Sequence, residues 1–478
     1  MTNVSDLSAS MSRPESHTRK WMFLVGGFGM LLPGLIWWIA FWPATMSRDS
    51  LTTWAAVVEG QPLEVMPVAY WGFVFLASLG GRALAVVTLT QVVALTVALY
   101  SLSRAVGLTS RRSAVVSGVV MLTPFGGLFA VTLWKDVPTA ILMLFGASFL
   151  AKSVRSRSFS RESVYGFVLI FVAGLLRFEA PLVIGTIGVV MLSFALLAES
   201  RSRRVLARSA GLLIGVAFAA ILVASSLQSL AASRGLPSWN KWIPAIADLA
   251  YVAATDPNAS GPGVDAAREM VTGAALDYAA DCQNHSRIFY DEGFKTQEAV
   301  RLEDRLPFLW FDALVTNPFP IVEAHICRGA PYLPPPLASS AGPHNWVITT
   351  IEQPNSSGLS LAAPVMVRQP LVAWAALWTA RSEFLAWPGL LGLVGTLSLI
   401  AIGRWKRDRS PRLVLAAFMW GTLLPFAAWT VLTDFRYAAV AQLIGVVAFV
   451  SYLGLLAFPE SVSDPESERR SAASTNSP

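Results

Sequence analysis

Charged side chains are scarce in this chain: aspartate, glutamate, lysine and arginine together make up 14% of its 478 residues. Soluble domains carry about 25% charged residues, so this deficit argues against an ordinary soluble protein. Hydrophobic residues make up 54% of the chain, and they fall in long apolar runs. A run of about 20 such residues is long enough to cross a bilayer as a helix. The composition therefore predicts an all-α polytopic membrane protein.

Cysteine and histidine are also rare, with two and four residues respectively. The cysteines have no CxxC or metal-ligand spacing, and the chain contains no P-loop, GxSxG, HExxH or Gly-rich dinucleotide sequence. Cys282 and Cys327 both lie in one polar region, where an extracytoplasmic location favours a disulfide between them. Two separate buried thiols are the alternative. The net charge of +6 does not indicate nucleic acid binding, because the basic residues are spread through short loops.

Ten apolar runs predict transmembrane helices. They lie at 21–42, 83–103, 113–133, 137–151, 163–176, 181–198, 209–231, 386–403, 413–432 and 437–458. The runs 137–151 and 163–176 are short, which suits helices beside a water-filled cavity. The polar segment 1–20 precedes a run too long for a signal-peptide core, so 21–42 is expected to remain as the first span.

Loop charge predicts the orientation of these spans. Twenty-one lysines and arginines lie in the tails and loops on the side of the N-terminus, against five in the short segments on the other side. The positive-inside rule therefore places both termini in the cytoplasm of a multi-pass plasma-membrane protein. The polar, Ser-rich tail 459–478 is expected to be a disordered cytoplasmic segment.

The outer side is expected to carry a first loop, 43–82, and a larger module, 232–385. Within the first loop, 66–80 is apolar but too short to span, so an interfacial helix is predicted there. The module follows spans 21–231 and precedes spans 386–458. It holds helix-like stretches and a Pro-rich passage, which together predict a small α-rich domain with a long loop. His344, just after that passage, is a candidate substrate contact, and a structural or surface role is the alternative.

Four outer turns each combine an acid and a base within a few residues. They read Arg48-Asp49, Lys135-Asp136, Arg177-Phe178-Glu179 and Asp434-Phe435-Arg436. Charge at the mouth of a helix bundle is costly unless it is paired, reaches water or serves a function. The four turns therefore predict a polar site at the outer membrane surface.

Asp49 and Asp136 are the candidate catalytic acids. A carboxylate at the surface can take the proton from a hydroxyl that attacks a sugar carbon. For Asp49 the alternative is to cap a short helix, either itself or through Ser50. Asp136 could orient an acceptor or bind a metal, and its alternative is a favourable interaction with the dipole of the helix that it begins.

The basic residues of these turns are candidate phosphate ligands. Lys135 can meet a phosphate as a point charge, whereas Arg177 and Arg436 can bind phosphate oxygens with two parallel hydrogen bonds. Interfacial ion pairs that close helical turns are the alternative. The residues expected to support these groups are Arg48, Glu179 and Asp434.

The order of these motifs resembles that of the GT-C superfamily of integral-membrane glycosyltransferases, including its bacterial members. The similar segments are Ser47-Arg48-Asp49, WKDVP at 134–138, LLRFEAP at 175–181 and TDFRY at 433–437. The late soluble module, preceded by several spans, is a further point of similarity. The resemblance covers most of 20–458. One departure is Met66, because relatives often have a histidine before the proline that corresponds to Pro67.

The resemblance implies a hexosyl- or pentosyltransferase of the cell envelope, with a polyprenyl-phosphate-linked sugar donor, inversion and an outward active site. Asp49 then matches the catalytic acid of the first outer loop, and Asp136 the acid of the second. The implied partners are this donor, a lipid, glycan or protein acceptor, and membrane lipids, without nucleic acid. A divalent cation, Mg or Mn, between the two acids is a candidate cofactor.

A lipid or small-molecule transporter or flippase without transferase activity is the alternative function. Transporters usually place polar groups near the bilayer midplane, in broken helices and paired repeats. Here the predicted spans carry no charge in their interiors, and no repeat is visible. A scaffold protein of the envelope is a third reading, in which the charge pairs would be structural.

Overall fold

The computed structural model is helical throughout the part of the chain that it describes. The described residues are 15–63, 66–198, 200–231, 242–281, 288–289, 291–333, 348–353, 355, 357–381, 387–405, 410–428 and 435–457. Within these ranges, strand pairing is limited to three isolated bridges. The all-α fold class predicted from composition is confirmed.

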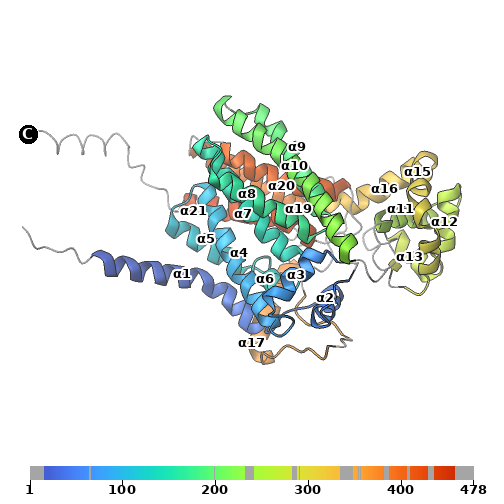
Figure 1. Cartoon of the computed structure of the whole chain (residues 1–478), viewed down its shortest axis with the longest axis horizontal. Helices are drawn as coiled ribbons and strands as arrows, with labels where there is room; N and C mark the ends of the chain where they lie inside the picture. The colour runs from blue at the N-terminus through green and yellow to red at the C-terminus, as the bar shows by residue number, and fades with distance from the viewer. Residues whose placement is uncertain are drawn as a thin grey trace, which may run out of the picture.

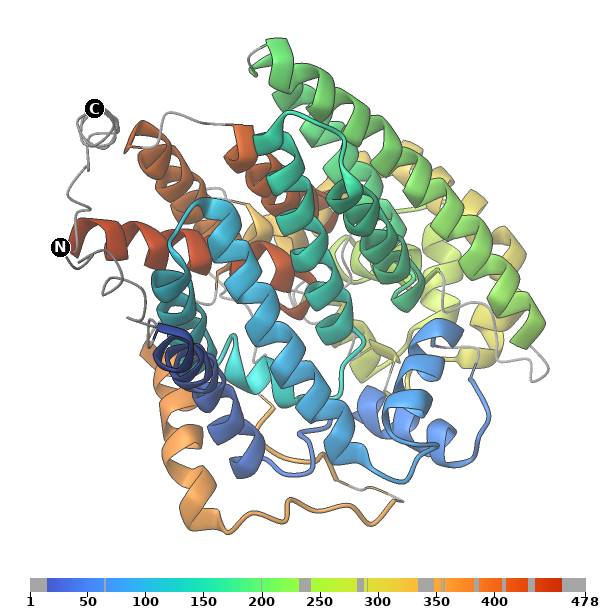
Figure 2. The ribbon, with the colours of Figure 1, turned by 60° about the vertical axis from the view of Figure 1, so that its left-hand side comes forward.

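Ten helices form one bundle, shown in Figures 1 and 2. They are α1 (Glu15–Ala40), α4 (Leu84–Val106), α5 (Ser110–Leu122), α7 (Asp136–Ser156), α8 (Arg161–Leu176), α9 (Ala180–Leu196), α10 (Ser200–Ala231), α19 (Pro388–Trp405), α20 (Ser410–Ala428) and α21 (Ala439–Ala457). A single apolar core runs through the bundle and includes Trp37, Leu99, Ile187 and Phe418, all fully buried. In its centre α20 packs against α7 and α9, so helices from both ends of the sequence meet.

Five of the described helices are long and apolar enough to cross a membrane. They are α4, α7, Ser202–Leu230 within α10, α20 and α21. Shorter apolar helices occur at Gly27–Ala40, Ala180–Leu196 and Pro388–Gly403, inside three further expected spans. The chain is thus an all-α membrane protein with several candidate spans, and the number ten stays a prediction.

The expected span 113–133 is wrong as a single helix. Here α5 ends at Leu122, and a separate short helix, α6 (Gly127–Val131), follows. Pro124 has no backbone N–H and disfavours a helical residue before it, which explains the extended backbone of Thr123. A Cβ at Gly126 would lie 2.4 Å from the carbonyl oxygen of Val120, so only glycine fits this turn. The break lets residues 132–135 run across the end of the bundle.

The first outer loop forms two short helices, α2 (Arg48–Val58) and α3 (Val68–Ala77). A helix does occupy the expected interfacial segment, as α3. It is joined to α2 by the indole of Trp71, which donates to the carbonyl of Ala56 at 3.1 Å. Met46, Tyr70 and Leu133 belong to the small core beneath this loop, which therefore packs the loop onto the turn after α6.

A second helical unit lies at one end of the bundle (Figure 1). Its helices are α11 (Ile243–Thr255), α12 (Pro262–Met270), α13 (Ala274–Ala280), α14 (Thr296–Arg301), η3 (Glu303–Arg305), α15 (Leu306–Thr316) and α16 (Pro318–Gly329), and η4 (Ala330–Tyr332) follows. This outer module, from α11 to α16, has its own apolar core, which includes Ile246, Met270 and Leu309.

The outer module is narrower than the expected 232–385, because residues 348–381 pack on the bundle instead. The backbone N–H of Ala362 donates to the carbonyl of Trp42 at 2.9 Å. In α17 (Val365–Arg381), the indole of Trp374 donates to the carbonyl of Leu122 at 3.0 Å. Figure 2 shows α17 beside α1. Trp378 of α17 also packs edge-on against Phe125, with ring centres 5.7 Å apart, which fixes this helix on the bundle.

Candidate functional site

Two of the charged turns are held at the same end of the bundle by direct backbone pairing. Thr45 and Thr132 form a parallel bridge, in which Thr45 N–H donates to Val131 and Leu133 N–H donates to Thr45, both at 3.1 Å. Their hydroxyl oxygens lie 2.7 Å apart. The indole of Trp134 donates to Ser47 Oγ at 3.0 Å. The turns that carry Asp49 and Asp136 are therefore fixed against each other.

Asp49 lies in the first turn of α2 with its carboxylate toward solvent. Ser47 is the N-cap of this helix and forms a capping box with Ser50, so the expectation that Asp49 or Ser50 would be the cap is wrong. This frees the Asp49 side chain, which is 60% exposed. Its Oδ2 lies 3.5 Å from Arg436 Nη1, a partner that holds the carboxylate without covering it.

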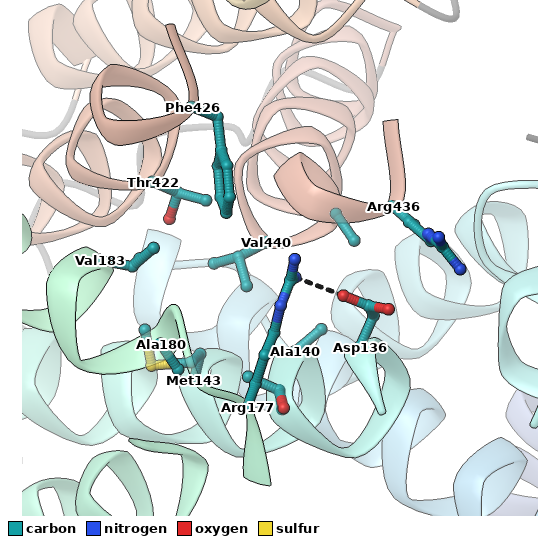
Figure 3. A pocket seen from close by; sticks show the side chains of 12 residues that line it. Asp136, Ala140, Met143, Arg177, Ala180, Val183, Thr422, Phe426, Arg436 and Val440 are labelled. Carbon is teal, nitrogen blue, oxygen red and sulfur yellow. Dashed lines mark hydrogen bonds and ion pairs between the residues drawn. The ribbon is translucent and has the colours of Figure 1, made fainter. Parts of the chain in front are cut away.

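Asp136 begins α7 and is buried, in contrast to Asp49. Its carboxylate forms an ion pair with Arg177, and the two side chains are only 3% and 6% exposed (Figure 3). Arg177 Nε also donates to Glu179 Oε2 at 3.0 Å. A charge this deeply buried requires a partner of opposite sign, and Arg177 supplies it. Asp136 also retains the favourable position in the first turn of its helix.

Two aromatic rings support the arginines. The guanidinium of Arg436, in η5 (Phe435–Ala438), lies 5.2 Å from the centre of the Trp134 ring. That of Arg177 lies 5.4 Å from the Phe426 ring. Both distances are within the range of cation–π attraction. The rings thus orient two cations from separate parts of the chain toward the same region, as Figure 3 shows for Arg177 and Phe426.

A small cavity of about 30 Å³ separates these groups (Figure 3). Asp136, Arg177, Phe426 and Arg436 line it, together with apolar residues of α7, α9 and α21. This volume holds about two water molecules. The cavity therefore admits only water-sized molecules, and Asp49 is not among the residues that line it.

Lys135 precedes α7 as its N-cap residue and is half-buried. Within the described part of the chain, its ammonium group makes no hydrogen bond or ion pair. Its charge still acts on Glu179, whose side chain is 48% exposed. The crowded surroundings act to raise the pKa of Glu179, but Arg177 and Lys135 outweigh this and lower that pKa from 4.5 to about 2. The site thus keeps Glu179 ionised and leaves one cation available for a ligand.

Among the described residues, two ion pairs join charged groups of different turns. The sequence predicted that each acid pairs with the base beside it, but Asp49 forms an ion pair with Arg436, and Asp136 forms one with Arg177. Arg177 with Glu179 is the local pair that is also present in the structure. Asp434 and His344 lie outside the described residues, so their expected roles stay predictions.

Sequence reasoning missed Glu352. Its carboxylate accepts a hydrogen bond from the backbone N–H of Arg48 at 2.7 Å, and its own N–H donates to Met46 at 3.0 Å. Met46 and Ile351 form a second parallel bridge. No local pattern marks Glu352, because the chain brings it to the first loop from a distant segment. Trp134, in contrast, could have been suspected, since it directly precedes Lys135-Asp136.

The divalent cation expected between Asp49 and Asp136 stays a prediction. Among the described residues, no group of three or more His, Cys, Asp or Glu could hold a metal ion. Asp49 and Asp136 each face an arginine instead of a shared space.

The predicted disulfide includes Cys282, which lies outside the described residues. Cys327 lies on α16, and the described part of the chain contains no free cysteine. The pairing of Cys282 with Cys327 stays a prediction.

Comparison with known proteins gives a distant structural likeness. No protein-family model matches the chain, and no curated protein matches it. Among solved structures, it is similar to the archaeal oligosaccharyltransferase AglB from Archaeoglobus fulgidus in complex with an inhibitory peptide and a dolichol-phosphate. The TM-score is 0.45 and the sequence identity 11%, over 92% of this chain and 51% of that one. The chain thus spans about half the length of AglB, and a likeness of this degree defines neither its family nor its activity.

Proposed function

We propose that this chain is an inverting glycosyltransferase of the GT-C type, which moves a sugar from a polyprenyl-phosphate donor to an extracytoplasmic acceptor. The observation that carries the proposal is the convergence of four charged turns at one end of a membrane bundle. There one exposed carboxylate, Asp49, lies beside Arg436, while Lys135 has no ion-pair partner in the described part of the chain. An acid and a free cation at a membrane surface suit a lipid-borne phosphate donor.

Asp49 is the proposed general base. Its carboxylate is exposed, and Arg436 Nη1 lies 3.5 Å from it. In the reaction, Asp49 takes the proton from the acceptor hydroxyl while that oxygen attacks the anomeric carbon. The bond from this carbon to the phosphate oxygen breaks at the same time, and the electron pair leaves with the phosphate. A single displacement of this kind inverts the configuration at the anomeric carbon.

Lys135 and Arg436 are the proposed contacts to the departing phosphate. Positive charge placed where negative charge develops lowers the barrier to the reaction. Arg177 is already neutralised by Asp136 and Glu179, so its contribution is smaller. In this proposal Asp136 is a positioning residue, because a carboxylate buried in an ion pair has little access to an acceptor. The two acids expected to act alike are thus assigned different roles.

The test compares two substitutions in a strain that lacks the protein. The deletion strain is complemented with wild type, Asp49→Asn or the control Asp265→Asn, and the glycans of its cell envelope are analysed. Asp265 is also an exposed aspartate, with 69% of its side chain accessible, but it lies on α12 of the outer module.

Wild type and the control should restore one missing sugar, whereas Asp49→Asn should not, at equal amounts of protein in the membrane. The identity of that sugar would name the donor's sugar and the product. Full restoration by Asp49→Asn would overturn the assignment of the base.

A further inference from the structure

A row of large apolar side chains lies exposed on the outer module, along α15 and α16. Its members are Phe308, Phe311, Val315, Phe319, Val322 and Ile326, with exposed fractions between 48% and 85%. Within α15 and within α16, successive members are three or four residues apart, which is the spacing of one helix face, and Asn317 separates the two helices. Single exposed apolar residues are common on proteins, but a contiguous row is typical of a binding surface.

The row is not a poorly packed core. The opposite sides of the same helices are buried in the module, where Leu309 is 2% exposed and Ala313 and Ile321 are fully buried. Both helices thus have an apolar side against the module and a second apolar side away from it. This second side has no role in folding the module, so it calls for a partner outside the module.

The acids of these helices are turned toward the module and away from the row. Asp312 Oδ2 accepts a hydrogen bond from the backbone N–H of Gly263 at 3.4 Å. Glu323 hydrogen-bonds the phenol of Tyr251 on α11. The row itself contains no charged residue. Its partner must therefore be apolar, and attraction to lysines, arginines or anionic head groups contributes little.

The position of α16 indicates which apolar partner can contact the row. This helix ends at Gly329, where a Cβ would lie 1.9 Å from the carbonyl oxygen of Ala427 in the last turn of α20. Because α20 is a candidate span, its last turn would lie near the edge of the bilayer that this helix crosses. Ile326 is three residues away, or about 4.5 Å along the helix. Each head-group layer is about 5–7 Å thick, so the row starts at head-group depth.

We propose that this row inserts into the outer leaflet of the membrane, so that the module rests on the bilayer through α15 and α16. Amphipathic helices with phenylalanine on their apolar side bind at this depth. Figure 1 shows α16 leaving the bundle beside α19 and α20, with α15 next to it on the same side of the module. The lipid surrounds these helix ends in any case, whereas another protein would have to displace it. The proposal does not depend on the transferase activity.

Site-specific fluorescence in lipid nanodiscs tests the proposal. Phe319 is replaced by cysteine and labelled with bimane, and Asp265→Cys on α12 is the control. Both positions are exposed, at 85% and 69%, so neither substitution removes core packing. Native Cys282 and Cys327 are replaced together by serine in both proteins, and monodisperse size-exclusion profiles establish that each remains folded. The nanodiscs contain phosphatidylcholine, with or without a lipid that carries a nitroxide quencher.

The label at Phe319 should emit at shorter wavelength than the control, be quenched by the nitroxide lipid and be shielded from iodide in the buffer. The control should show the opposite, and high salt should leave the result at Phe319 unchanged. Equal iodide quenching at both positions would overturn the proposal. So would energy transfer between donor- and acceptor-labelled Phe319→Cys copies in one nanodisc, because that would make a second copy the partner.

Discussion

The ion pair between Asp136 and Arg177 gives the most direct test of how this site is held together. Replacing Asp136 by asparagine keeps the size of the side chain but removes its charge. Arg177 would then remain buried, at 6% exposure of its side chain, with Glu179 as its nearest described acid. Glu179 is about half exposed and so compensates only in part.

The burial of this ion pair sets the expected loss in the free energy of unfolding. Removing one partner of a buried ion pair costs about 3–5 kcal/mol, because the other charge stays buried without its counter-charge. The hydrogen bond from Arg177 to Glu179 at 3.0 Å remains in the variant. The free energy of unfolding should therefore fall by about 3 kcal/mol, the lower end of this range. At Asp49 the pair with Arg436 is longer and its acid is 60% exposed. Exposed pairs contribute about 0–1 kcal/mol, so Asp49→Asn should scarcely change stability.

Unfolding of the purified protein in detergent provides the assay, followed by tryptophan fluorescence in increasing denaturant. Asp136→Asn should unfold at a clearly lower denaturant concentration than wild type. The unfolding curve of Asp49→Asn should coincide with that of wild type. The double variant Asp136→Asn with Arg177→Met should recover part of the loss, since it leaves no unpaired guanidinium. Equal stability of Asp136→Asn and wild type would refute the reasoning, as would a larger loss for Asp49→Asn than for Asp136→Asn.

Three further outcomes are expected. Tyr70→Phe should unfold no earlier than wild type in the same assay, because the Tyr70 hydroxyl is buried without a hydrogen-bond partner in the structure and its removal breaks no bond. Trp134→Leu should lower sugar transfer more than stability, measured on membranes at equal protein, because it removes the ring beneath Arg436 and the bond to Ser47. The outer module should lose stability in acid: burial acts to raise the pKa of Asp248, but Arg328 and His325 outweigh it and lower that pKa below 3.8. The stabilisation is thus present above about pH 3.8 and lost as the pH falls through the folded-state pKa, so limited proteolysis across this range should show the module opening in wild type and a flatter profile in Asp248→Asn.

The sequence predicted the helices well where a long apolar run had clear ends. The segments that became α4, α20 and α21 are each apolar over about a bilayer's thickness and are bounded by charge or proline. The span expected at 113–133 failed because hydropathy averages over a window. Pro124 and Gly126 interrupt the helix through backbone geometry, to which an average over apolar side chains is insensitive.

The candidate site likewise combines features that the local sequence predicts with features that depend on packing. Alternation of loops across a bilayer was enough to expect Asp49, Asp136, Arg177 and Arg436 on one side. It did not reveal which acid would be exposed, since burial depends on how neighbouring helices pack. Asp136 is covered because α7 packs against α20 and because Arg177 pairs with it, whereas Asp49 stays exposed because Ser47, and not Asp49, is the N-cap of α2.

Composition and the length of the apolar runs were sufficient to predict an all-α membrane protein and to locate its charged turns, because both are local properties of the chain. The pairing of Asp49 with Arg436 and of Asp136 with Arg177, the contact of Glu352 with the first loop, and the exposed apolar row on α15 and α16 became visible only in the folded chain. Each of these depends on contacts between segments far apart in the chain. Such contacts are selected by packing of whole helices, and no periodicity within one segment encodes them.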